Sequence, residues 1–277
     1  MSASRQTLTL VLLSLFGLIF LYPLLWLLSA SFKTNSEIFS SLSLWPGIWN
    51  TEAYTEGWRG IGKYGFAAFF KNTLVLTVPA VVLTVLSSTV VAYGFARFRF
   101  PGKKALFALM LSTLMLPDSV LLIPRYLLFR ELNWLNTYLP FYIPALLAVH
   151  AFFVFLLVQF FRGLPRELDE AAYIDGCGSF AILARILIPL SGPALISAAL
   201  FQFIWTWNDF FNALIFINSV SKFPVSLGLR MALDNEGAVH WNRVMAMSVL
   251  AIVPCIAVFF TAQKYFVEGI STTGLKG

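Results

Sequence analysis

Apolar residues are gathered into six long blocks along the 277-residue chain, with polar residues between them. Each block holds roughly the 20 residues that a helix needs to cross the hydrocarbon of a bilayer. Helix is the expected form because lipid offers no partner to a free backbone N–H or C=O group. The pattern predicts an all-α membrane protein with six transmembrane helices, at residues 8–30, 72–96, 105–128, 137–161, 192–216 and 244–266.

The charge of the segments between the spans predicts their orientation. Residues 97–104 contain four Lys or Arg side chains and no acid, which is the strongest topological signal in the chain. Short basic loops stay in the cytoplasm. With six spans, both termini and the segment after the fourth span are then cytoplasmic as well. The first span, 8–30, is longer than the core of a cleaved signal peptide, and we interpret it as retained in the membrane.

Composition supports a membrane environment. Hydrophobic residues make up 59% of the chain, charged residues only 12%, and the mean hydropathy is +0.81. The 19 basic residues, which give a net charge of +6, lie in short groups, and no long basic run predicts binding of nucleic acid. The predicted outer loops hold tryptophans of the kind that anchor a protein at the membrane boundary: Trp45, Trp49, Trp58, Trp134 and Trp241.

Patterns that would indicate catalysis or metal binding fail in this sequence on spacing or context. Cys177 and Cys255 form no disulfide framework, and neither histidine has a Cys or carboxylate at metal-ligand spacing. Residues 60–65 match the dinucleotide pattern G-x-G-x-x-G, but residues 55–59 do not form the strand that must precede it. We therefore expect no enzyme, no metal site and no ATP site in this chain.

The polar segment 164–190, between the fourth and fifth spans, has the pattern of a first short helix. Pro165 suits a first helical turn, and the acids that follow it suit the positive end of the helix dipole. Leu168, Ala171 and Ala172, with Asp175, share one face at helical spacing. Gly176 suits a left-handed stop at the C-terminal end.

A second short helix is predicted at residues 179–188. Phe180, Leu183 and Leu187 lie on one side of it, and Pro189 closes it before the fifth span. The residues thus predict a helix–turn–helix on the cytoplasmic surface. Its small side chains would let another backbone approach closely. An interfacial helix pair lying on lipid headgroups is an equal alternative on these grounds.

Several motifs resemble one family of transport proteins. Glu170-Ala171-Ala172, followed by Gly176 and by residues 186–189, resembles the EAA loop of binding-protein-dependent ABC importer permeases, except that Ile188 stands where Leu commonly precedes the proline. Further segments look like carbohydrate-uptake permeases related to the second permease subunit of the maltose transporter, so that the resemblance covers essentially the whole chain: 72–73, 93–97, 207–209, 263–270 and 274–277.

The resemblance implies a type I ABC importer permease fold, with residues 1–277 as a single transmembrane domain and residues 164–190 as its coupling loop. It implies a heterodimer with a homologous second permease, two ATP-binding subunits that hold ATP and Mg²⁺, and an extracytoplasmic solute-binding protein, in the bacterial inner membrane. No cofactor would bind to this chain itself. ATP-driven closure of the partner would pull the coupling helix and turn the spans from inward-facing to outward-facing. The residues that the resemblance assigns to this coupling are Glu170, Ala171, Ala172, Asp175, Gly176 and Pro189.

Polar residues inside the fifth span mark a candidate transport path, because such residues are costly in a membrane. Gln202, Trp205, Asp209 and Asn212 fall on one helical stripe, with Asn208 beside it. Aromatic faces with amide and carboxylate neighbours suit sugar binding, and polar packing against the partner permease is an equal alternative. In this family the main sugar contacts lie mostly in the other permease.

Two further expectations concern the outer end of the third span and the transported compound. Asp118, with Arg125 and Arg130 after it, predicts an ion pair or a docking contact. The resemblance favours an oligosaccharide from plant or algal polymers, including acidic ones, and leaves glycerol phosphate and disaccharides open. A secondary transporter is the rival class, but it would show a sequence repeat, and we find none.

Overall fold

The computed structural model describes residues 3–60, 63–234 and 239–274, with side chains from residue 7 to residue 264 of these ranges. Ile61 and Gly62 of the glycine-rich segment and residues 275–277 of the tail lie outside the described residues. The chain divides into two compact units, Met1–Phe70 with Leu227–Pro254 and Lys71–Ser226 with Cys255–Gly277. Each unit is described by itself, and the single domain expected from the sequence stays a prediction.

Within the described ranges, four helical segments are long and apolar enough to cross a membrane. They are α1 (Ala3–Ala30), α4 (Phe66–Arg97), the pair α7 and α8 (Leu139–Leu146 and Ala151–Gly163), and α15 (Trp241–Gly274). The count reaches six only if each of two bent helix pairs is one span. The all-α class is confirmed, and the third and fifth spans differ from the straight helices that the sequence predicts.

The third span is broken at Pro117. Helices α5 (Lys103–Thr113) and α6 (Asp118–Glu131) meet at 100°. Pro117 has extended backbone angles, φ −62° and ψ 133°. A proline at this point offers no N–H to continue α5 and disfavours helix in the residue before it. At 1.5 Å per residue, α5 is roughly 16 Å long, which is too short to cross the hydrocarbon alone.

The predicted fifth span, 192–216, is also interrupted. Helix α12 (Gly192–Trp207) ends before Asn208, and α13 (Phe211–Phe216) follows it. An Asp209 carboxylate oxygen accepts the backbone N–H of Asn212 at 3.1 Å, so a side chain starts the second helix. A side-chain acceptor of this kind competes with continued helix, and a window of apolar residues does not reveal it.

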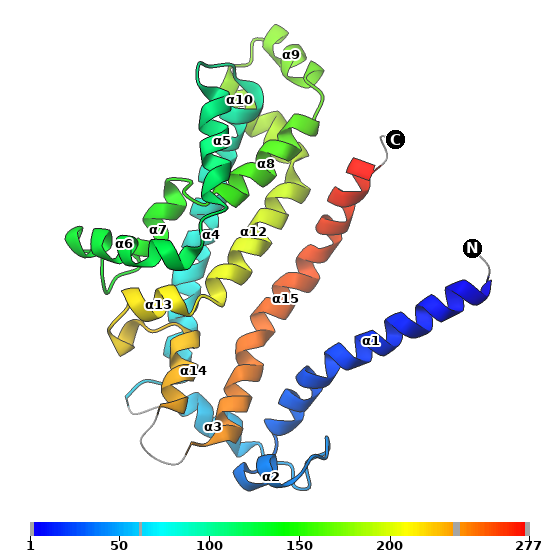
Figure 1. The fold of residues 1–277 in the computed structure, drawn as a ribbon, viewed down its shortest axis with the longest axis vertical. Helices are drawn as coiled ribbons and strands as arrows, with labels where there is room; N and C mark the ends of the chain where they lie inside the picture. Colours follow the sequence, from blue (N-terminus) through cyan, green and yellow to red (C-terminus); the bar gives the residue numbers. More distant parts are fainter. Residues whose placement is uncertain (1–2, 61–62, 235–238, 275–277) are drawn as a thin grey trace. The chain divides into compact units, whose positions relative to one another are not determined.

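The core of the second unit lies where α4, α8 and α12 meet the segment between α8 and α12. This segment contains α9 (Glu167–Ile174), α10 (Ser179–Ile182), a π-helical turn (Leu183–Leu187) and α11 (Ile188–Leu190). Figure 1 shows α9 and α10 at the end of the unit where α5 begins. One cluster of buried apolar residues joins all of these elements apart from α11.

In the first unit, the loop after α1 packs on the start of α15. The Asn35 side-chain oxygen accepts the Trp241 backbone N–H at 2.8 Å, and Met247 fills the space beside Gly57. Lys33 is fully buried, and its ammonium group donates a hydrogen bond to the Ser43 carbonyl. The remaining short helices are α2 (Asn35–Ser40), α3 (Glu52–Arg59), α14 (Val225–Leu233) and the 3₁₀ turn Val220–Lys222.

Within the second unit, side chains at the start of α4 form hydrogen bonds with the 3₁₀ turn and with the segment that follows it. The Asn72 amide donates to the carbonyls of Ser221 and Phe223 at 2.8 and 3.0 Å. One residue on, the buried Thr73 hydroxyl accepts the backbone N–H of Val225 at 2.8 Å. Thr77, one turn later, is equally buried, but its hydroxyl has no hydrogen-bond partner among the described residues.

We expect Thr73→Val to lower the melting temperature of the purified full-length chain in detergent. The substitution leaves the buried N–H of Val225 without its acceptor, at a cost of about 1–3 kcal/mol, or on the order of 5 °C. Thr77→Val, the matched control, removes a hydroxyl that accepts or donates nothing and should change the melting temperature little. Equal losses for both variants would contradict the prediction.

Candidate coupling surface and transport path

The segment 164–190 forms the predicted helix–turn–helix, with two differences in detail. The first helix, α9, begins at Glu167, two residues after Pro165, with its three acids in the first turn. The second helix is continuous from Ser179 to Leu190 but contains the π-helical turn. It ends beside Pro189, where the chain bends by 79° into α12.

Gly176 ends α9 as the sequence predicts. Its φ of +80° is in the left-handed region. The backbone N–H of Gly176 donates to Tyr173, and that of Cys177 donates to Ala172, at 3.0 and 2.9 Å. These two bonds form a Schellman motif, which satisfies the last carbonyls of the helix.

One face of the segment is buried in its own unit. Ala172 of α9 and Ile182, Leu183 and Leu187 of the second helix belong to the apolar cluster of this unit. Their neighbours in the cluster come from α4, α8 and α12: Ala92, Tyr93, Ala96, Val154, Leu157, Val158, Phe161 and Ala194. Ala172 therefore lies against this chain, and of the two alanines of the motif only Ala171 is exposed.

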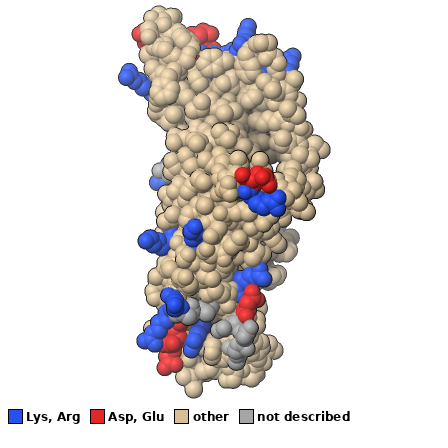
Figure 2. Space-filling view, turned by 90° about the vertical axis from the view of Figure 1, so that its left-hand side faces the viewer, with Lys and Arg blue, Asp and Glu red and all other residues tan. Residues whose placement is uncertain are grey.

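The opposite face is exposed and mixes acids with large apolar side chains. Glu170 and Asp175 are exposed, Ile174 is 87% exposed and Phe180 is 79% exposed. Phe180 is exposed whereas Leu183 and Leu187, predicted on the same side of the second helix, are buried, because the start of this helix extends past the core that buries the other two. In Figure 2, acidic and basic atoms lie at the upper end, the one that carries α9 and α10 in Figure 1, above a surface that is mostly uncharged.

The polar residues of the candidate transport path do not form the predicted stripe, because α12 ends at Trp207. Gln202 is buried and donates to the Thr206 hydroxyl at 2.8 Å. Trp205 is 49% exposed and packs on Phe152 and Phe153, with ring centroids 5.1 and 5.2 Å apart.

The other members of the set lie at the break itself. The exposed Asn208 donates to the Ile204 carbonyl at 2.8 Å. Both oxygens of Asp209 accept hydrogen bonds from the Asn212 side chain, at 3.1 and 2.8 Å. The structure thus gathers Asn208, Asp209 and Asn212 at the end of α12, and sets Gln202 apart as an internal partner of Thr206.

The predicted ion pair at the outer end of the third span is present. A guanidinium nitrogen of Arg125 lies 3.0 Å from a carboxylate oxygen of Asp118, across the first two turns of α6. Arg130 pairs with its neighbour Glu131 instead, at 3.2 Å. Both pairs are exposed, and exposed pairs contribute only about 0–1 kcal/mol.

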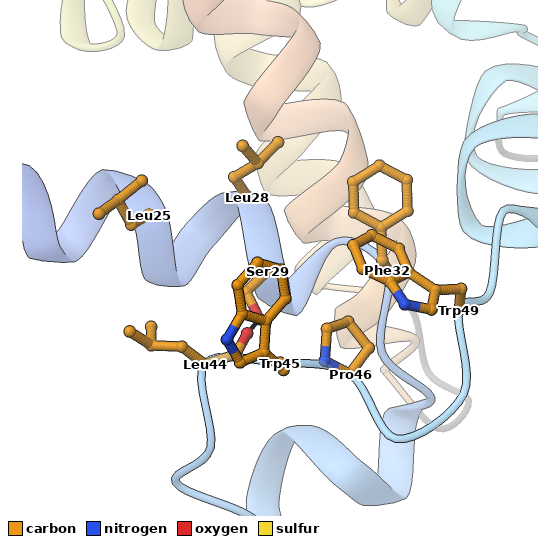
Figure 3. A pocket seen from close by; sticks show the side chains of 8 residues that line it. All are labelled: Leu25, Leu28, Ser29, Phe32, Leu44, Trp45, Pro46 and Trp49. Atoms are coloured by element: carbon orange, nitrogen blue, oxygen red, sulfur yellow. Dashed lines mark hydrogen bonds between the residues drawn. The ribbon is translucent and has the colours of Figure 1, made fainter.

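A cavity in the first unit was not predicted (Figure 3). It has a volume of about 350 Å³ and lies between the last turns of α1 and the residues that follow Leu44. Its lining is apolar apart from Ser29, whose hydroxyl donates to the Leu44 carbonyl. Trp45 and Trp49, interpreted above as boundary anchors, form part of its wall.

A family model described as a binding-protein-dependent transport system inner membrane component matches residues 88–272. The chain belongs to this family. The matched region contains the whole coupling segment and the interrupted fifth span. The chain is therefore a permease, a multi-pass membrane subunit of an ABC transporter, as the motifs around Glu170 predict.

Known relatives of this permease match it over nearly its full length. The probable ABC transporter permease protein YurM of Bacillus subtilis (strain 168) is 34% identical over 267 residues, which cover 96% of this chain and 87% of YurM. The arabinooligosaccharides transport system permease protein AraQ of the same organism is 34% identical over 279 residues, covering 100% and 97% of the two chains.

A solved structure confirms the permease fold. A chain of a bacterial ABC transporter involved in the import of the acidic polysaccharide alginate superimposes with a TM-score of 0.84 and is 25% identical. The similarity covers 96% of this permease and 99% of that chain.

We expect Gly176→Ala to loosen the end of α9. A Cβ at Gly176 would meet nothing within 4 Å, so the cost is conformational, about 1–2 kcal/mol for a left-handed alanine. Hydrogen exchange at the Cys177 amide should then be roughly 5- to 30-fold faster.

The matched control for this prediction is Gly178→Ala. Gly178 has an ordinary φ of −73° and equally open space around its Cα. An alanine there should leave the exchange of the Cys177 amide close to that of the unaltered permease. Equal acceleration by both substitutions would refute the conformational explanation.

Proposed function

We propose that this permease is one half of the membrane domain of an importer that moves an oligosaccharide into the cell by alternating access. A solute-binding protein would deliver the sugar on the outer side. ATP and Mg²⁺ would bind to two partner ATPase subunits, and a homologous second permease would complete the pathway. The observation that carries the proposal is that α9 has one exposed face, while its other face is fixed in the buried apolar cluster of the second unit.

The composition of α9 favours a protein partner over a lipid surface. Interfacial helices that bind anionic lipids are rich in Lys and Arg. The first turn of α9 instead holds Glu167, Asp169 and Glu170, and the eight residues of the helix contain no base. Acids would be repelled by an anionic leaflet, whereas Ile174 and Phe180 gain free energy when another protein covers them.

The basic loop supports a cytoplasmic position for this surface. Arg97, at the end of α4, donates a hydrogen bond from its guanidinium group to the Leu164 carbonyl at 3.2 Å. The loop 97–104 and the segment 164–190 therefore lie at the same end of the second unit. A loop of this charge stays on the cytoplasmic side of the bacterial inner membrane, where an ATPase can reach Glu170.

The interruption after α12 is the proposed contact with the sugar. Trp205 offers an aromatic face for stacking, and the exposed Asn208 offers an amide for hydrogen bonding. Asn212 donates its hydrogen bonds to the Asp209 carboxylate at the break, and Gln202 donates to Thr206 inside α12. An oligosaccharide is favoured over glycerol phosphate or a disaccharide because AraQ, named for arabinooligosaccharides, is 34% identical, whereas relatives named for diacetylchitobiose and for trehalose and maltose are 30% and 31% identical. A secondary transporter is disfavoured by the family.

We expect Glu170→Lys to remove the ATPase from the purified complex while the permease stays in the membrane. Charge reversal on the exposed face should weaken binding about tenfold or more, which corresponds to about 1.4 kcal/mol. Quantifying the ATPase that co-purifies with the tagged permease measures the effect.

Glu131→Lys is the control for this substitution. It makes the same charge change at an exposed glutamate whose one ion-pair partner among the described residues is a neighbouring exposed arginine. It should leave the amount of co-purified ATPase unchanged. Normal ATPase binding and sugar uptake by Glu170→Lys would refute the proposed docking surface.

The substrate class is tested by ATP hydrolysis of the complete transporter in liposomes. We expect its binding protein to stimulate hydrolysis when loaded with arabinooligosaccharides or alginate oligosaccharides, and much less when loaded with glycerol phosphate or maltose. Stimulation by glycerol phosphate alone would overturn the oligosaccharide assignment and leave the permease assignment intact.

A further inference from the structure

One buried ion pair connects the end of α4 to the coupling helix. The Arg97 Nε lies 2.6 Å from an Asp169 carboxylate oxygen, and the two side chains are 6% and 13% exposed. The same guanidinium group donates to the Leu164 carbonyl just before α9. Arg97 therefore holds both the entry to α9 and its first turn.

A second polar contact from α4 reaches the other half of the segment. The hydroxyl of Tyr93, one turn before Arg97 on the same face of α4, donates to the Ser179 carbonyl at 3.0 Å. The Ser179 hydroxyl in turn lies 2.9 Å from the hydroxyl of Tyr173 in α9. Both short helices are thus tied to one face of α4.

The Arg97–Asp169 pair is buried, in contrast to the other ion pairs. In the four other pairs among the described residues, at least one side chain is more than half exposed. Such exposed pairs contribute little, and their geometry is loosely held. A buried pair is costly to form, and both the second oxygen of Asp169 and the Nε of Arg97 lack a hydrogen-bond partner within the described ranges, so that charge alone joins the two side chains. A pair with this cost is poorly explained by stability alone.

Apart from Tyr93, the buried residues through which α4 and α9 share one cluster are alanines. Ala92 and Ala96 of α4 and Ala172 of α9 are buried in the same cluster. Small side chains allow close approach but offer no directional contact, so α9 could turn or slide against α4. The ion pair supplies a contact at one defined point of each helix, which these alanines lack.

We propose that Arg97 and Asp169 are positioning residues that lock α9 to α4, so that a displacement of the exposed face of α9 moves α4 as one body. This inference rests on the proposed docking of an ATPase at Glu170, and it assigns α4 as the spanning helix that receives the movement. Tyr93, through Ser179, holds the second half of the segment to the same helix.

The test measures sugar imported per ATP hydrolysed by the complete transporter in liposomes. The probe is radiolabelled arabinooligosaccharide or alginate oligosaccharide, whichever stimulates hydrolysis in the assay above. We expect Asp169→Asn to retain the co-purified ATPase and to keep hydrolysis within about twofold, but to lower the transport ratio about tenfold. Asp169→Glu, which keeps the charge, should recover most of the ratio.

Asp169→Asn leaves a buried arginine without its counter-ion and can prevent folding, so a double variant carries the test as well. Arg97→Met with Asp169→Leu removes both charges and keeps apolar bulk. We expect it to be stable in the membrane, to bind ATPase normally and to transport with the same low ratio. The control Glu131→Gln removes one carboxylate from an exposed pair and should change none of these quantities.

An unchanged transport ratio in the assembled double variant would overturn the inference. So would loss of ATPase binding by the double variant at a normal membrane level, because the pair would then shape the docking surface rather than transmit movement. If the unaltered permease binds no ATPase, the proposed function itself fails, and this outcome is distinct from either of the others.

Discussion

The burial of one face of the coupling segment against the ends of α4 and α8 is the contact on which the rest of this permease depends. Helix α9 has eight residues, and a helix of that length is unstable in water by itself. Ala172 on α9 and Leu187 on the second helix share one cluster with Phe161 of α8. This burial keeps α9 folded and also determines which face stays exposed.

The interrupted spans obey the same requirement that makes the other spans helical. A break in an apolar segment frees backbone N–H and C=O groups, which need partners from the protein. Asp209 accepts the N–H of Asn212 after the break in the fifth span. The Asn136 side chain accepts the N–H groups of Asn218 and Ser219 where α13 gives way to irregular backbone. These two departures from helix are thus stabilised by Asx side chains.

Local pattern was sufficient to predict the coupling helices but not the contacts between distant residues. Gly176 could be assigned because an acid-rich first turn and a helix stop lie within ten residues of each other. The Arg97–Asp169 pair could not, because nothing in residues 97–104 distinguishes an arginine that turns inward from one that marks the cytoplasmic side. The exposure of Phe180 was also missed. Helical periodicity predicts which residues share a side of a helix, but not how far along the helix the neighbouring elements cover that side.

Affinity and direction come from different side chains on each face of α9. On the exposed side, Ile174 of α9 and Phe180 of the neighbouring α10 offer apolar area, whereas Glu170 would offer a charge that selects partner and register more than it adds affinity. On the buried face, Ala172 supplies close packing and Asp169 supplies direction through Arg97. A helix held by apolar contact alone on both faces could bind an ATPase and still rotate when pulled. In the proposed coupling, two charged contacts, one toward each neighbour, would make an eight-residue helix able to transmit a movement.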